Sequence, residues 1–273
     1  MAFVVDRDTK AGVFVEDSSK VIEHMMNPNN MVWLDFYQPN YRWIQQKFRI
    51  PKRLINACLE DGSYCEFIKG MFLLKIVAMN ADDIDETVFL KIIVGERVIF
   101  TLRDSTIRSI DPERLDGDKL AVKLAGGADN LLCYFLDRIT KDYRLVLEKL
   151  QNECDAFQLE HIGNFNPYDK IYDLSNRVTS YPQIFTQQLV VLRDLACRTT
   201  PLLKKSSILQ LRGVLQRVRS VCSGMVSLEK SLMVFLKIQS IHSLSHSYKN
   251  LRMTIIVSAL ALMLCLLMAT LFF

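Results

Sequence analysis

Apolar residues in the first 128 positions come in short runs that end at turn-forming residues. Runs of this length and composition predict strands, which lie at residues 31–37, 70–79, 87–94 and 97–103. Short helices are predicted over residues 43–48 and 52–60, and Gly62 ends the second of them. The Gly95-Glu96 turn joins two of the strands into a hairpin. We therefore expect residues 1–128 to form a mixed α/β domain.

The pattern changes to a helical period after Gly126-Gly127. From Asp129, which suits an N-cap, apolar residues recur three and four positions apart as far as residue 157, and this predicts a long amphipathic helix. A second helix is expected over residues 167–198, with a kink near Pro182. Residues 206–273 contain no proline, so one helix of 68 residues, roughly 100 Å long, can follow.

The last 21 residues, 253–273, carry no charged side chain. As a helix they would cover roughly 30 Å, the hydrocarbon thickness of a bilayer. We expect this segment to cross the membrane once, with the hydroxyls of Thr254, Ser258 and Thr270 bonded to its own backbone. The expected α+β architecture has an α/β domain (1–128), two long antiparallel helices (129–205), the stalk of a very long helix (206–252) and a transmembrane end (253–273).

Charge is unevenly distributed along the chain, whose net charge is +4. Residues 201–252 hold nine lysines and arginines against the single acid Glu229, whereas the rest of the chain holds 25 basic and 29 acidic residues. A basic helix beside a bilayer attracts anionic headgroups, by about 1 kcal/mol for each side chain at the surface, but a solvated helix face has the same composition. Lys249 and Arg252 stand just before the apolar segment, and the N-terminus lacks a secretory pattern, so we expect residues 1–252 in the cytoplasm.

Motifs of the common enzyme classes are absent from the sequence. It contains no G-x-S-x-G, P-loop, H-E-x-x-H or G-x-G-x-x-G pattern, so we expect neither enzymatic activity nor a tightly bound cofactor. The basic stretch lacks interleaved aromatic residues, which argues against nucleic acid as a partner. The seven cysteines show no C-x-x-C spacing and fit small core residues in a reducing compartment.

Oxygen-bearing side chains follow one another where the predicted stalk meets the membrane. Ser247, Asn250, Thr254 and Ser258 are spaced three and four apart and so share one helix face, and Thr270 lies further along. A hard cation such as Mg²⁺ prefers oxygen ligands and keeps most of its water, so this face suits the lining of a cation path. Serine and threonine are also common in membrane helices because they bond locally to the backbone, and that alternative stays open.

Two further groups of residues are candidates for metal binding. His242 and His246 stand four apart on the same predicted helix, a spacing that can hold Zn²⁺ but that also fits two exposed histidines. The densest acidic cluster consists of Asp82, Asp83, Asp85 and Glu86. This cluster can hold Mg²⁺ or Ca²⁺ loosely, or it can form the solvated tip of a hairpin.

Several strings occur in the order known from one family of membrane proteins. They are Trp33-Leu34-Asp35 with Pro39, Ile50-Pro51 with Leu59-Glu60, Leu73-Leu74-Lys75, Val98-Ile99-Phe100-Thr101, residues 130–139, and Arg252-Met253-Thr254-Ile255-Ile256. Together with the order of elements, they resemble the CorA-type divalent-cation transporters, including the zinc-transporting ZntB branch. The resemblance implies a homo-oligomer, expected to be a pentamer, in the lipid bilayer of the inner (cytoplasmic) membrane. Its transported or regulatory ion would be Mg²⁺, Co²⁺, Ni²⁺ or Zn²⁺.

The family pattern is incomplete in these 273 residues. Family members end the first span with Gly-x-Asn and continue into a second span, whereas an ungapped alignment on Thr254-Ile255-Ile256 places Leu271-Phe272-Phe273 there. Two hypotheses follow, a divalent-cation transporter and a transport-incompetent or truncated relative that acts as a tail-anchored assembly or binding module. A plain coiled-coil adaptor is a third, although the heptads of residues 206–250 are irregular.

Overall fold

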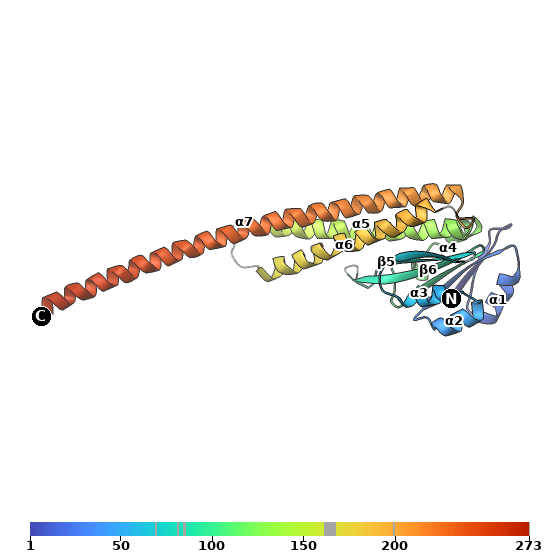
Figure 1. The fold of residues 1–273 in the computed structure, drawn as a ribbon, viewed down its shortest axis with the longest axis horizontal. Helices are drawn as coiled ribbons and strands as arrows, with labels where there is room; N and C mark the ends of the chain where they lie inside the picture. Colours follow the sequence, from blue (N-terminus) through green and yellow to red (C-terminus); the bar gives the residue numbers. More distant parts are fainter. Residues whose placement is uncertain (69, 81, 84–85, 161–167, 199, 273) are drawn as a thin grey trace.

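The computed structural model describes the backbone of residues 1–273 apart from 69, 81, 84–85, 161–167, 199 and 273. Wherever the backbone is described, the side chain is described too, except at residues 18–19, 113, 158–160, 168–171, 239, 242–247, 261–262 and 264–272. The described residues form a sheet flanked by helices and a bundle of long helices, one of which continues far beyond the others (Figure 1).

A mixed sheet of seven strands occupies the first part of the described chain. Its strands are β1 Ala2–Asp6, β2 Gly12–Val15, β3 Asn30–Tyr37, β4 Tyr64–Ile68, β5 Met71–Met79, β6 Thr87–Gly95 and β7 Val98–Arg103. They lie in the order β2-β1-β3-β7-β6-β5-β4, in which β3 and β7 pair in parallel and the other neighbours pair antiparallel. The two outer strands, β2 and β4, therefore form the edges of the sheet.

Helices cover both faces of the sheet (Figure 1). They are α1 Ser18–Met26, α2 Tyr41–Phe48, α3 Lys52–Leu59, the 3₁₀ turn η1 Pro112–Arg114, α4 Gly117–Ala125, α5 Ala128–Glu160, α6 Tyr168–Cys197 and α7 Lys205–Phe272. The core under α1–α3 contains Leu54 and Phe100, and the core under α4–α7 contains Trp33, Phe72 and Phe135. Side chains alternate between the faces of a strand, so both faces are apolar.

Local sequence explains where two of the short helices begin. The side chain of Asn40 accepts a hydrogen bond from the backbone N–H of Trp43 at 3.1 Å and caps α2. Asp116 accepts from the N–H groups of Asp118 and Lys119, both at 3.2 Å, and caps α4. Each cap satisfies donors that the first turn of a helix leaves unpaired.

The long helices form the bundle that leads away from the sheet. α5 and α6 run in opposite directions, and α7 runs back along both before it extends beyond them (Figure 1). α7 is continuous over 68 residues. Gly224 lies where α7 passes close to α5, because a Cβ atom there would be 2.6 Å from Cδ2 of Leu147. This glycine therefore serves helix packing rather than merely weakening the helix.

The structure contains the strands and helices predicted from the longer patterns. Elements that were not predicted from the sequence are β1, β2, α1, β4, η1 and α4, each of nine residues or fewer. Such short segments show only one or two periods of any pattern. α2 and α3 have eight residues each and were predicted, because Pro39, Pro51 and Gly62 mark their ends. The predicted role of Asp129 as the N-cap of its own helix is wrong, because α5 already begins at Ala128.

The apolar end of the chain was predicted to cross a membrane. No helix in the described part of the chain has an apolar window long enough for a membrane span. This finding does not support the predicted single span over residues 253–273, most of whose side chains lie outside the described set. The division of the chain at residues 128, 205 and 252 stays a prediction.

Candidate functional site

The projecting end of α7 carries the polar positions singled out in the sequence. Asn250, Thr254 and Ser258 are exposed and lie on successive turns. The hydroxyl of Thr254 donates to the carbonyl oxygen of Asn250 at 2.9 Å, and the hydroxyl of Ser258 donates to the carbonyl oxygen of Thr254. Ser247 and Thr270 are also predicted members of this face, but their side chains lie outside the described set.

These hydrogen bonds determine what the polar face can offer to an ion. A hydroxyl has one proton and two lone pairs. Here each hydroxyl donates its proton in a hydrogen bond to a backbone carbonyl oxygen of the helix, and its lone pairs remain. A cation is bound by lone pairs, so Thr254 and Ser258 keep the groups that a cation needs. Successive positions four residues apart rise by about 6 Å along the helix. One helix therefore offers single oxygens at successive levels rather than a complete set of ligands at one level. We call Asn250, Thr254 and Ser258 the polar ladder.

Apolar side chains surround this polar face on the part of α7 that leaves the bundle. The exposed ones are Val234, Ile238, Ile241, Tyr248, Leu251, Met253, Ile255, Ile256, Val257, Leu260 and Met263. Large apolar side chains that are exposed in this number are typical of a region that contacts another protein or a membrane.

The other residues predicted to bind metal are only partly covered by the described side chains. The side chains of His242 and His246 lie outside the described set, as does Asp85. Asp82 accepts a hydrogen bond from the Thr106 hydroxyl at 2.9 Å, and Glu86 accepts one from the Asn80 amide. Within the described residues, no group of three or more histidine, cysteine or acidic side chains can hold a metal ion.

A buried ionic network on β3 and β7 was missed by the sequence analysis. The Asp35 carboxylate accepts from the Thr101 hydroxyl at 2.7 Å and from Nε and one terminal nitrogen of Arg103 at 3.1 and 2.8 Å. Trp33 donates its indole N–H to Thr101 Oγ1 at 2.9 Å. The network thus joins two residues of the Trp33-Leu34-Asp35 string to the parallel neighbour strand. Acidic and basic residues at the ends of buried strands are the signal that could have revealed it.

A second buried carboxylate fixes the start of α7. Asp129 accepts a hydrogen bond from the Ser207 hydroxyl at 2.7 Å and from the Lys204 backbone N–H at 3.0 Å. Lys204 directly precedes α7 and Ser207 lies in its first turn, where the unpaired N–H groups and the helix dipole favour a negative charge. Asp129 is therefore the cap of α7 rather than of α5, and it ties the base of the long helix to the bundle.

Replacing Asp129 with alanine is expected to lower the free energy of unfolding by about 1–2 kcal/mol. The substitution leaves the Lys204 N–H and the buried Ser207 hydroxyl without their acceptor. Hydrogen exchange at residues 205–209 should accelerate, because the first turn of α7 loses its anchor. Asp116→Ala, which removes the exposed cap of α4, is the matched control and should leave exchange in α7 unchanged. Unaltered protection of residues 205–209 in Asp129→Ala would contradict this role.

One comparison with known proteins shows a family, and another shows the fold. The family model described as CorA-like Mg²⁺ transporter protein matches residues 28–272. A search of the curated proteins found no match. Among solved structures, the full-length CmaX protein is similar at a TM-score of 0.77 and 12% identity, over 92% of this chain and 79% of that one.

Two further solved structures are similar along most of the chain. The complete CorA magnesium transporter from Methanocaldococcus jannaschii matches at a TM-score of 0.75 and 18% identity, over 94% of this chain and 81% of that one. The ZntB cytoplasmic domain from Vibrio parahaemolyticus RIMD 2210633 matches at a TM-score of 0.68 and 14% identity, over 88% and 97% respectively. At these identities the likeness concerns the fold.

Proposed function

Because the chain belongs to the family of CorA-like Mg²⁺ transporter proteins, we propose that it moves divalent cations across the cytoplasmic membrane, with α7 lining the path. The observation that carries the proposal is the ladder of Asn250, Thr254 and Ser258 on the exposed end of α7. The hydroxyl protons are bonded to the backbone, so the ladder offers lone pairs to an ion or to its water shell. The proposed function is transport rather than enzymatic catalysis, with Mg²⁺, Co²⁺, Ni²⁺ or Zn²⁺ as the substrate.

The proposed path requires the apolar end of α7 to enter the bilayer. Residues 253–273 carry no charge, and Lys249 and Arg252 precede them. Basic residues beside a span stay on the cytoplasmic side, so residues 1–252 would face the cytoplasm. In this proposal the chain crosses the bilayer once, through residues 253–273.

The proposed path also requires several copies of the chain. A single helix presents one oxygen per level, whereas a hydrated cation needs oxygens around it, which a ring of equivalent helices supplies. The exposed Val234 and Ile238 of α7 line a groove of about 450 Å³ together with Phe235 and three polar residues, Ser227, Lys230 and Ser231. The apolar part of this groove suits contact with a second copy, and we propose a pentamer.

Ion flux into liposomes tests the proposal directly. The full chain, reconstituted into vesicles loaded with a Mg²⁺- or Zn²⁺-sensitive dye, is expected to give a signal above that of empty vesicles. Asn250→Leu removes an amide oxygen from the ladder and should lower the flux about tenfold, since loss of one ion contact of about 1.4 kcal/mol corresponds to that factor. Leu251→Ala changes the neighbouring exposed side chain and is the matched control.

The outcomes of this experiment separate the two hypotheses. Absence of flux from an intact oligomer would overturn transport and favour a membrane-anchored assembly or binding module. Equal flux in Asn250→Leu and Leu251→Ala would show that the polar ladder does not line the ion path. Native mass measurement of the detergent-solubilised chain gives the subunit number in the same preparation.

A further inference from the structure

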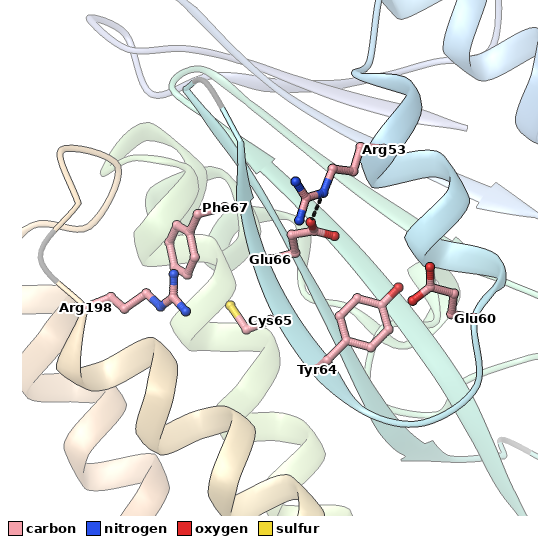
Figure 2. A pocket seen from close by; sticks show the side chains of 7 residues that line it. All are labelled: Arg53, Glu60, Tyr64, Cys65, Glu66, Phe67 and Arg198. Carbon is pink, nitrogen blue, oxygen red and sulfur yellow. Dashed lines mark ion pairs between the residues drawn. The ribbon is translucent and has the colours of Figure 1, made fainter.

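A cavity of about 360 Å³ lies along the outer edge of β4, the last strand of the sheet (Figure 2). It is lined by the four consecutive residues 64–67 of β4, by Arg53 and Glu60 at the two ends of α3, and by Arg198 just after α6. Neighbouring side chains of a strand point to opposite faces, so a cavity that touches all four must straddle the strand edge. We call it the β4 groove.

Two guanidinium groups reach the β4 groove from opposite faces of the sheet (Figure 2). Arg53 contacts Oε1 of Glu66 through Nε at 2.5 Å, and Arg198 donates from Nε to both carboxylate oxygens of Asp194 at 3.2 Å. The guanidinium of Arg198 also lies 4.8 Å from the centre of the Phe67 ring. Both arginines are thus held by Nε, and their terminal amino groups have no hydrogen-bond partner among the described residues.

A third donor in the β4 groove is the hydroxyl of Tyr64. Its oxygen is shielded from solvent and has no hydrogen-bond partner among the described residues. Burial raises the pKa of Tyr64, with smaller contributions from Cys58 and Glu60, so the hydroxyl keeps its proton and remains a donor. A donor that is shielded from water and has no acceptor raises the free energy of the folded protein. A ligand oxygen that accepts this hydrogen bond would remove the penalty.

We propose that the β4 groove binds a soluble phosphate monoester, with the phosphate oxygens between Arg53 and Arg198. Guanidinium forks match phosphate geometry and bind it bidentately. Glu66 and Asp194 are already engaged by these arginines, which leaves Glu60 as the one free lining carboxylate among the described residues. Glu60 lies on the side of Tyr64 away from Arg198 (Figure 2) and favours a hydroxyl or amine at the other end of the ligand.

The size and position of the β4 groove support a soluble organic ligand. A volume of about 360 Å³ equals roughly twelve water molecules, which exceeds one phosphate ion. Arg198 lies near the start of α7, and 48 residues of helix, roughly 70 Å, separate Lys205 from Met253. A bilayer that receives the apolar end of α7 would not reach the groove. The site is independent of cation transport.

Isothermal titration calorimetry of the full chain in detergent tests the site, with glycerol phosphate and inorganic phosphate as probes at constant ionic strength. We expect saturable binding of glycerol phosphate at one molecule per chain, and weaker binding of inorganic phosphate. Arg198→Met and Arg53→Met should each weaken binding tenfold or more, since charge-assisted hydrogen bonds are lost. Tyr64→Phe should weaken it about threefold. Arg198→Lys keeps the positive charge but loses the planar guanidinium that binds phosphate bidentately. Its affinity should lie between those of wild type and Arg198→Met.

Matched controls make each result decisive. Arg219→Met removes an exposed arginine on α7 that donates a hydrogen bond to the Gln216 side chain and does not line the groove, so this variant should bind like wild type. Glycerol without phosphate should give no saturable heat, and thermal melting confirms that each variant is folded. The proposal is overturned if neither phosphate compound saturates, if both Arg53→Met and Arg198→Met retain full affinity, or if Arg219→Met weakens binding equally. If phosphatidylglycerol vesicles bind and compete with glycerol phosphate, the ligand is a lipid headgroup, and the proposal of a soluble phosphate monoester is wrong.

Discussion

Replacing Asp35 with alanine is expected to lower the free energy of unfolding by about 3–5 kcal/mol. Asp35 and Arg103 form a buried pair, with side chains 4% and 9% exposed. The Asp35 carboxylate accepts hydrogen bonds from Arg103 and Thr101 on the parallel strand β7. Removing the carboxylate leaves the Arg103 guanidinium in a low-dielectric interior without its counter-charge, which costs more than the pair itself contributes.

Chemical denaturation followed by tryptophan fluorescence measures this effect. Trp33 is fully buried and donates to Thr101, so its emission reports on the same network. Glu148→Ala breaks the exposed pair with Arg144 on α5 and is the matched control, with an expected loss below about 0.5 kcal/mol. The double variant Asp35→Leu, Arg103→Met should be more stable than Asp35→Ala, because it leaves no unpaired charge. A loss in Asp35→Ala as small as that in Glu148→Ala would show that the pair is not buried in solution.

The sequence pattern predicted the central strands but not which polar residues they bury. Lys75 and Lys91 occupy facing positions on β5 and β6, both buried. Lys91 donates to Asp104 and to the Tyr41 hydroxyl, whereas Lys75 donates to the Glu60 carbonyl oxygen at the end of α3. Burial, reinforced by the neighbouring Lys91 charge, lowers the pKa of Lys75. Their partners come from other elements, so alternation along one strand cannot reveal this arrangement.

The same limit applies to the candidate sites. The positions Asn250, Thr254 and Ser258 follow from helical spacing alone, because residues four apart share a helix face. Asp129 shows the opposite case, since its true partners, Lys204 and Ser207, lie more than seventy residues away in the chain. The β4 groove is assembled from three separate elements, so no local pattern predicts it. Local periodicity therefore yields elements and faces, while contacts between elements require the fold.

One aromatic cluster lies where the bundle of long helices meets the sheet. Phe185 of α6 is fully buried, and its ring centroid lies 4.8 Å from that of Tyr143 on α5 and 5.8 Å from that of Tyr181. The hydroxyl of Tyr143 donates to the backbone carbonyl oxygen of Val77 on β5. Phe185 thus packs against one of the residues that connect α5 to the sheet. This position gives it a role in coupling the two parts as well as in the core.

Phe185→Ala is expected to lower the free energy of unfolding by about 3–5 kcal/mol, because truncation of a buried phenylalanine loses its burial and leaves a cavity. The ring of Tyr143 loses its packing partner, so the hydrogen bond to Val77 should open more often and amide exchange in β5 should accelerate. Tyr172→Ala removes an aromatic ring that is 66% exposed on the same helix and is the matched control, with an expected change within about 0.5 kcal/mol. Phe185→Leu fills most of the cavity, so its loss of free energy of unfolding should lie between the losses in Phe185→Ala and Tyr172→Ala. If Phe185→Ala destabilises the chain but leaves exchange in β5 unchanged, the cluster supports the bundle alone and does not couple it to the sheet.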